Sequence, residues 1–134
     1  MGGGDLMLDT SAYGAFKRGQ REVVTALQHS SRVLLSAVAI GELLAGFAVG
    51  HRRAENVREL QAFLGRPRVT IASAGLATAE RFAQIYAYLR SAGTPIPTAD
   101  LWIAAAAMEH GAELLTLDAH FLCVPQVVVR HVLA

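Results

Sequence analysis

Short apolar runs alternate with longer helical segments along this chain, and that alternation limits the folds open to it. Runs typical of buried strands lie at residues 6–8, 33–35, 68–72, 114–117 and 127–129. Segments with helical spacing of apolar residues lie between them, at 23–28, 38–49, 54–64, 76–91 and 100–110. Strands alternating with helices in this way form parallel sheets through right-handed crossovers. We therefore expect an α/β fold, with a central parallel sheet of about four to five short strands between two layers of helices.

The chain has 134 residues, which suits one domain because a single core usually serves about 100 to 200 residues. Hydrophobic residues make up 53% of it and charged residues 17%, which excludes intrinsic disorder. We expect residues 1–134 to form a single domain, with 1–4 as a flexible leader. The single cysteine, Cys123, excludes a disulfide framework and a cysteine-based zinc site. Without a secretory signal or a membrane-spanning apolar stretch, a cytoplasmic location is expected.

Four acidic residues fall near predicted strand ends or within apolar helical segments. Asp9 follows the first predicted strand and Asp118 the fourth, and ligands bind outside the carboxyl ends of parallel strands. Asp100 lies in the first turn of a helix, for which Thr98 is the expected cap, and Glu42 is flanked by apolar residues. Carboxylates gathered at low dielectric repel one another unless a cation compensates. Such oxygen ligands suit Mg²⁺ or Mn²⁺ rather than Zn²⁺.

Each acid also has a purely structural explanation. Asp9 could cap the helix that follows it, and Asp100 could be a favourable anion at a helix N-terminus. Asp118 could be an ordinary turn residue. Glu42 differs, because a carboxylate in apolar surroundings is seldom buried without a partner. The functional interpretation therefore depends on the four acids together.

The segments that contain these acids resemble, in order, the motifs of PIN-domain nucleases: residues 6–12, 35–43, 96–105 and 115–121. More narrowly, the chain resembles the VapC toxins of bacterial toxin–antitoxin pairs over essentially its whole length. The resemblance implies a PIN-like three-layer sandwich and a magnesium-dependent endoribonuclease. It assigns catalytic and metal-binding roles to Asp9, Glu42, Asp100 and Asp118. The last motif is the most variable among members, and His120 stands where an acid is also common.

The resemblance further implies that Mg²⁺, with Mn²⁺ as a substitute, is held by these carboxylates directly or through water. The ion activates water for hydrolysis of an RNA phosphodiester bond. Neighbouring hydroxyls are expected to hydrogen-bond the carboxylates or the water around the ion, and they belong to Thr10, Ser11, Thr98 and Thr116. Helix capping is an equal alternative for Thr10 and Thr98. The five histidines lack metal-ligand spacing, so surface or packing roles are expected for them.

Two protein partners follow from the resemblance: a second copy of the chain and a cognate antitoxin, in a heterotetramer or a larger assembly. The antitoxin could dock on helices 38–49 and 54–64, where small residues permit close approach; internal packing is the alternative. The apolar stripe from Leu76 to Leu89 is interpreted as core or as a dimer face. Contacts to RNA phosphates are predicted for four arginines, with a solvated surface as the alternative: Arg52, Arg53, Arg66 and Arg68.

A net charge of +1 does not argue against RNA binding. A metal centre that holds four of the eleven acidic residues leaves seven acidic residues and twelve Lys and Arg on the rest of the protein.

A phosphotransferase of the haloacid-dehalogenase type or a receiver domain also has an aspartate after its first strand. The former needs a second aspartate where this chain has Ser11, and both need a late lysine, whereas the only lysine is Lys17. An RNA-processing PIN nuclease outside a toxin pair and a catalytically silent PIN-fold binding module remain as alternatives.

Overall fold

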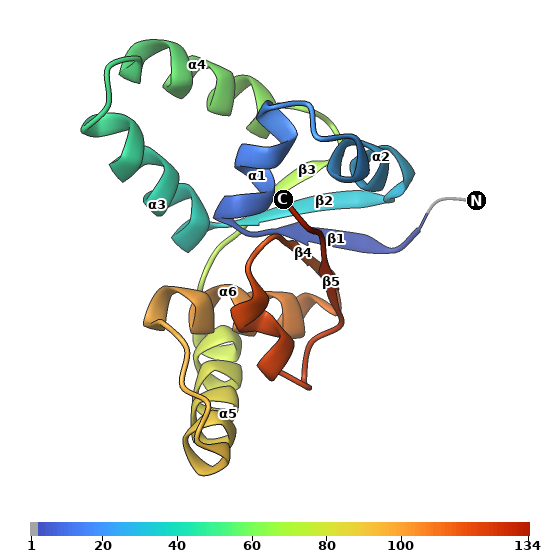
Figure 1. Cartoon of the computed structure of the whole chain (residues 1–134), viewed down its shortest axis with the longest axis vertical. Helices are drawn as coiled ribbons and strands as arrows, with labels where there is room; N and C mark the ends of the chain where they lie inside the picture. The colour runs from blue at the N-terminus through green and yellow to red at the C-terminus, as the bar shows by residue number, and fades with distance from the viewer. Residues whose placement is uncertain (1–2) are drawn as a thin grey trace.

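The computed structural model describes residues 3–134 and contains a five-stranded parallel sheet (Figure 1). The strands are β1 (Asp5–Leu8), β2 (Arg32–Ser36), β3 (Val69–Ala72), β4 (Glu113–Thr116) and β5 (Val129–His131). Their order in the sheet is β3-β2-β1-β4-β5, and every neighbouring pair is parallel. The predicted number of strands and their parallel arrangement are confirmed.

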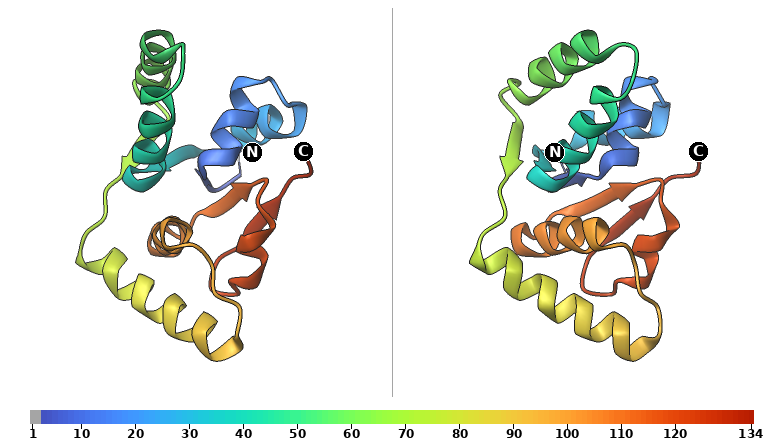
Figure 2. Two further views of the ribbon diagram at one scale, coloured as in Figure 1. Left: turned by 60° about the vertical axis from the view of Figure 1, so that its left-hand side comes forward. Right: turned by 90° about the vertical axis from the view of Figure 1, so that its left-hand side faces the viewer.

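Helices cover both faces of this sheet (Figures 1 and 2). On one side lie α1 (Thr10–Lys17), α2 (Arg21–His29), α3 (Ala37–Ala48) and α4 (Arg53–Leu64). On the other lie α5 (Leu76–Ala92) and α6 (Thr98–His110), and α5 packs mainly on α6. A short 3-10 helix, η1 (Ala119–Cys123), precedes β5. This is the predicted three-layer sandwich, and within residues 3–134 no helix has the length and apolar character needed to cross a membrane.

The core lies on the two faces of the central strands. Its largest fully buried side chains from the sheet are Met7, Leu8, Leu34, Leu35, Leu114 and Leu115. Strands buried on both faces are apolar throughout rather than alternating, which explains the uninterrupted runs in the sequence. The small residues Ala104–Ala107 of α6 are also buried, and they let this helix approach the sheet closely.

The ends of two helices test the predicted caps. The Ser36 hydroxyl accepts a hydrogen bond from the Ala39 amide at 3.1 Å and so begins α3, as predicted. Gly111 ends α6 in the left-handed region, with φ of 60°. The prediction that Thr98 caps α6 is wrong, because Pro97 occupies the cap position and Thr98 is the first helical residue.

The last strand is displaced from its predicted position. The run Val127–Val129 is continuous in the sequence, but the strand covers only Val129–His131. The Val127 amide bonds to the Val124 carbonyl, so this residue still belongs to the turn after η1. Val128 is 69% exposed, and pairing with β4 begins only at Val129. An apolar run therefore located this strand to within two residues but did not fix its register.

The start of the described chain is tied to the sheet. Gly3 and Gly4, which the sequence places in a flexible leader, form backbone hydrogen bonds with His29 and Ser31. These bonds lead directly into β1, which begins at Asp5. Residues 1–2 of the expected leader lie outside the described residues.

Candidate active site

Asp9 lies where β1 ends and α1 begins, and its carboxylate is held by three donors. Its Oδ1 accepts from the Ala12 amide at 2.8 Å, which makes Asp9 the cap of α1. The Thr116 hydroxyl donates to Oδ2 at 2.6 Å. The Ser11 hydroxyl donates as well, 2.7 Å from Oδ1 and 2.9 Å from Oδ2. The capping role is therefore confirmed, and it leaves the carboxylate at the carboxyl end of the sheet, only 4% exposed.

The same two hydroxyls tie the end of β4 to the start of α1. The Ser11 oxygen accepts from the Leu117 amide at 3.0 Å, and the Thr116 oxygen accepts from the Asp118 amide at 2.9 Å. Each hydroxyl thus donates to Asp9 and accepts from the backbone that leads to Asp118. The predicted contacts of Ser11 and Thr116 with a carboxylate are present, and they fix one acid relative to another that lies far along the sequence.

Asp100 and Asp118 meet beside the imidazole of His120. Asp118 caps η1, because its Oδ1 accepts from the His120 amide at 2.9 Å. The His120 Nδ1 atom lies 3.1 Å from Asp118 Oδ1 and 3.4 Å from Asp100 Oδ2. One ligand atom from each of the three residues lies within 4.8 Å of the other two. The topology therefore brings together residues from the first turn of α6 and from the turn after β4.

Glu42 is in a different environment from the one its neighbours in the sequence suggest. Its neighbours in the sequence are apolar, but Glu42 is exposed on α3 together with Leu44 and Ala45. Its Oε1 accepts a hydrogen bond from the Thr10 hydroxyl at 2.6 Å. Since Thr10 directly follows Asp9, this bond holds Glu42 at the same end of the sheet as the aspartates.

Electrostatic effects distinguish two of these acids. The pKa of Asp9 is raised, chiefly by burial and slightly by the charge of Asp118, although the hydrogen bonds from Thr116, Ala12 and Ser11 act in the opposite direction. Burial also raises the pKa of Asp100. A hydrogen bond with His120 opposes that effect, whereas the charges of Asp118 and Glu42 add to it. All four acids are thus connected by bonds or by mutual repulsion.

This group of acids fits a divalent cation. Within the described part of the chain, no Lys or Arg forms an ion pair with Asp9, Glu42, Asp100 or Asp118. Repelling carboxylates without a basic partner destabilise a fold unless a cation offsets their charge. Carboxylate oxygens are the ligands that Mg²⁺ and Mn²⁺ prefer, and those of Asp100 and Asp118 lie within 4.8 Å of each other and of a ring nitrogen of His120.

Thr98 lies apart from this cluster. It is exposed and lines a hollow on the other side of its helix, with Tyr86 of α5 and with Pro95 and Ile96 of the connecting loop. Among residues 3–134, no hydrogen bond joins its hydroxyl to a carboxylate. The predicted contact of Thr98 with the acids is therefore not found.

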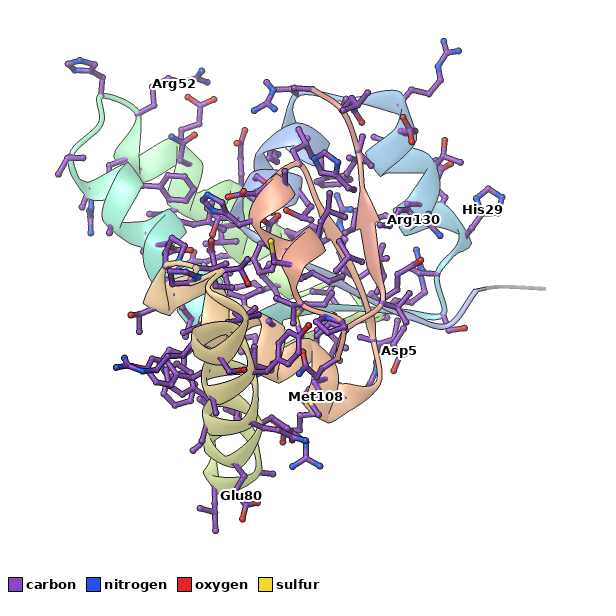
Figure 3. The ribbon with its side chains drawn as sticks, turned by 60° about the horizontal axis from the view of Figure 1, so that its bottom comes forward. Asp5, His29, Arg52, Glu80, Met108 and Arg130 are labelled. Carbon is purple, nitrogen blue, oxygen red and sulfur yellow. The ribbon has the colours of Figure 1, made fainter. Side chains whose placement is uncertain are left out.

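Two of the four arginines predicted to contact RNA lie at the outer end of the α3–α4 pair. Arg52 forms an ion pair with Glu55, in the first turn of α4, and Arg53 is exposed beside it. Figure 3 shows Arg52 on the opposite side of the molecule from His29 and Arg130. Both arginines are accessible to a large ligand.

The other two arginines already have partners within the chain. The Arg66 guanidinium lies over the ring of Phe63, 5.4 Å from its centroid. Arg68 donates to the Ser30 carbonyl at 2.6 Å. Both residues are nevertheless exposed, so their contacts with RNA stay a prediction.

The sequence places His120 where an acid is also common but does not predict its contacts with the acids. Its side chain is 54% exposed, in keeping with the expected surface position, and its ring also contacts two carboxylates. Spacing between histidines does not reveal these contacts, because the partners of His120 are acids. The usable signal was its place two residues after Asp118, on a turn that Asp118 could cap.

Comparisons with known proteins agree with this fold and site. The family model for the PIN domain matches residues 6–126. Ribonuclease VapC4 of Mycobacterium tuberculosis is 32% identical over 95 residues, which cover 71% of this chain and 73% of that protein. Family membership is thus supported by sequence over most of the chain.

Solved structures match the fold as well. A crystal structure of VapBC2 from Rickettsia felis, bound to a DNA fragment from their promoter, has a TM-score of 0.84 and 21% identity. The match covers 96% of this chain and 98% of that one. A crystal structure of FitAcB from Neisseria gonorrhoeae has a TM-score of 0.71 and 27% identity, over 92% and 95% of the two chains. This chain belongs to the PIN-domain family and, within it, to the VapC group.

Proposed function

We propose that this protein is a metal-dependent endoribonuclease and the toxin of a type II toxin–antitoxin pair. The observation that carries the proposal is the position of Asp9, Asp100 and Asp118 at one end of the sheet, with no Lys or Arg paired to them among the described residues. Membership in the VapC group supports the reaction, since the matched relative is named a ribonuclease. The substrate is RNA, and the bond cleaved is a phosphodiester.

In this proposal Asp9, Asp100 and Asp118 hold Mg²⁺, or Mn²⁺ in its place, directly or through water. The ion supplies the positive charge that activates water and stabilises the charge that develops on phosphorus. Glu42 would hold or orient a water molecule bound to the ion: Thr10 occupies its Oε1 atom, and Oε2 is left to accept a hydrogen bond. Ser11 and Thr116 keep the Asp9 carboxylate in place, so that it would be positioned to hold the ion.

The test is RNA cleavage by the wild type and by Asp9→Asn, with mapping of the product ends. The substitution keeps an oxygen that can cap α1 but removes the charge. Asp5→Asn is the matched control, because Asp5 lies at the opposite end of β1 and pairs with Arg32. We expect cleavage with Mg²⁺ that leaves 5′-phosphate and 3′-hydroxyl ends, stops in a chelator, survives Asp5→Asn and falls at least about a hundredfold in Asp9→Asn.

Two outcomes would contradict the proposal. Full cleavage by a folded Asp9→Asn variant would remove Asp9 from the catalytic group. No cleavage of tRNA, rRNA or mRNA by the wild type with either metal would favour a catalytically silent binding module. Cleavage without an antitoxin gene next to this one would instead favour an RNA-processing nuclease outside a toxin pair.

The proposed antitoxin docks on the surface formed by α1, α3 and α4. Helix α3 is apolar but exposes much of its length, including Leu44 and Ala45, and Val49, which follows it at the C-cap, is 88% exposed. Between the three helices lies a hollow whose lining includes Tyr13 and Phe47. The Tyr13 hydroxyl is buried there without a hydrogen-bond partner among the described residues. An apolar segment of the antitoxin fits the exposed apolar side chains of this surface.

A second copy of the chain is proposed to bind along α5. This helix packs mainly on α6 and leaves large apolar side chains exposed, including Leu76, which is 78% exposed, and Tyr86 and Tyr88. Tyr86 stacks on Phe82, which in turn packs on Trp102 of α6. Exposed aromatic side chains on a rigid support are typical of the centres of protein interfaces. With antitoxin bound to each toxin, the assembly is a heterotetramer or larger.

A further inference from the structure

The third member of the cluster formed with Asp100 and Asp118 is a nitrogen donor. His120 follows Asp118 by two residues, and its backbone amide donates to Asp118 Oδ1. That bond, together with the start of η1, turns the imidazole toward the carboxylates. Its Nδ1 atom lies 3.1 Å from Asp118 Oδ1 and 3.4 Å from Asp100 Oδ2, and the three ligand atoms stay within 4.8 Å of one another.

These separations suit ligands that share one ion. Two adjacent ligands on an octahedral ion with bonds of about 2.1 Å are about 3.0 Å apart, and two opposite ligands are about 4.2 Å apart. A single Nδ1 proton can donate to only one of the two carboxylates, whereas one cation can be shared by Nδ1 and both of them. The spacing of the three atoms therefore matches ligands arranged around a shared centre.

The same cluster is open to an incoming ion. The side chain of His120 is 54% exposed, so a hydrated cation can reach it from solvent, whereas Asp100 beneath it is mostly covered. Two other histidines have different partners: His29 Nδ1 contacts the Thr25 carbonyl and His131 Nε2 contacts the Leu117 carbonyl. Within residues 3–134, His120 is the histidine whose ring contacts carboxylates.

We propose that His120 is a direct metal ligand through Nδ1, so that the centre prefers Mn²⁺ to Mg²⁺. This inference rests on the proposed metal-dependent function and refines it. Carboxylates and water suit both ions, whereas an imidazole nitrogen binds transition-metal ions far better than Mg²⁺. A single nitrogen among oxygen ligands thus shifts selectivity toward manganese without changing the reaction.

The test measures bound Mn²⁺ rather than cleavage. Electron spin echo envelope modulation of the full chain loaded with Mn²⁺ detects a directly bound ¹⁴N nucleus, and competition calorimetry gives the ratio of the Mn²⁺ and Mg²⁺ dissociation constants. We expect ¹⁴N modulation in the wild type. In His120→Asp, which replaces the nitrogen by oxygens, the modulation disappears and the preference for Mn²⁺ falls at least about tenfold, while Mn²⁺ still binds. His51→Asp, in the exposed turn after α3, is the control and should match the wild type.

The possible failures are distinct. If Mn²⁺ binds and depends on Asp118 but shows no ¹⁴N modulation, or if the modulation persists in His120→Asp, then His120 is not a ligand and the proposed function stands. If the wild type binds neither Mn²⁺ nor Mg²⁺ at millimolar concentrations, the metal site fails and the proposed function fails with it. If the ¹⁴N modulation disappears in His120→Asp and persists in His51→Asp, His120 is a direct metal ligand.

Discussion

The Thr116 hydroxyl offers a direct measure of how tightly the strand ends are held together. The residue is fully buried, donates to Asp9 at 2.6 Å and accepts from the Asp118 amide at 2.9 Å. Thr116→Val keeps the shape of the side chain and removes both bonds. Thr116→Ser is the matched control, because it keeps the hydroxyl and loses only a methyl group.

The expected loss follows from these contacts. A hydrogen bond to a charged group contributes about 1.5 to 3 kcal/mol to the free energy of unfolding, and the neutral bond to the Asp118 amide adds about 1 kcal/mol. We therefore expect Thr116→Val to lower the free energy of unfolding by about 3 kcal/mol, which is a fall of roughly 10 °C in Tm for a chain of this size. Thr116→Ser should cost about 1 kcal/mol, the usual loss for one buried methyl group.

The effect also depends on pH in a defined direction. The hydrogen bond from Thr116 lowers the pKa of Asp9, whose net pKa is nevertheless raised above 3.8 by burial. Removing the bond raises that pKa further, so the difference between wild type and Thr116→Val is full above both folded-state pKa values. It shrinks as the pH falls through them. Thr116→Ser keeps the bond and should show no such change.

Urea unfolding of the metal-free protein in chelator measures the free energy of unfolding of all three proteins under identical conditions, at several pH values from about pH 8 down to about pH 3.8, the ordinary pKa of the group. The reasoning would be refuted if Thr116→Val were as stable as Thr116→Ser at the upper end. It would also be refuted if the loss in Thr116→Val were the same at every pH, because the bond to a charged Asp9 would then contribute nothing.

Three further outcomes are expected. Asp9→Asn should raise the Tm of the metal-free protein at neutral pH. The pKa of Asp9 is raised in the folded protein, so the protonated carboxyl stabilises the fold at low pH and this stability is lost as the pH rises from 3.8 through the folded-state pKa. The neutral amide of the variant avoids that loss, and a lower Tm would contradict this. Ala45→Arg should reduce antitoxin co-purification at least about tenfold and change the free energy of unfolding by less than about 0.5 kcal/mol. Thr25→Arg on α2 should leave co-purification unchanged. Unchanged co-purification in Ala45→Arg would exclude the surface of α1, α3 and α4. Tyr86→Arg should convert a dimer to a monomer by light scattering, and an unchanged mass would place the dimer face elsewhere.

Local chemistry made the framework of the fold predictable. Ser36 marks the start of α3 because a hydroxyl before an apolar helix has one favourable use, to accept from an amide in the first turn. The uninterrupted apolar runs identify strands buried on both faces. Val127 to Val129 show the limit of this reasoning, since the register of β5 is set by its pairing with β4 rather than by its own residues.

The site was predictable to a smaller extent. Asp9 and Asp118 could be placed because parallel strands end at the same edge. The exposure of Glu42 could not be predicted, because apolar neighbours on α3 indicate burial only when other parts of the same chain pack over them. The role of His120 depends on Asp100, which lies on another element, and no local pattern reveals that contact.

The bonds from Thr116 to Asp9 and from Leu117 to Ser11 also set the order in which this protein becomes functional. Asp9 is synthesised 107 residues before Thr116, whose hydroxyl holds its carboxylate, and Ser11 is synthesised 106 residues before Leu117. Strand β1 has β2 as a neighbour early and must wait for β4 to complete its other edge. Contacts so distant in sequence form late in folding. A growing chain therefore carries its acids unassembled until β4 and the turn after it have been made.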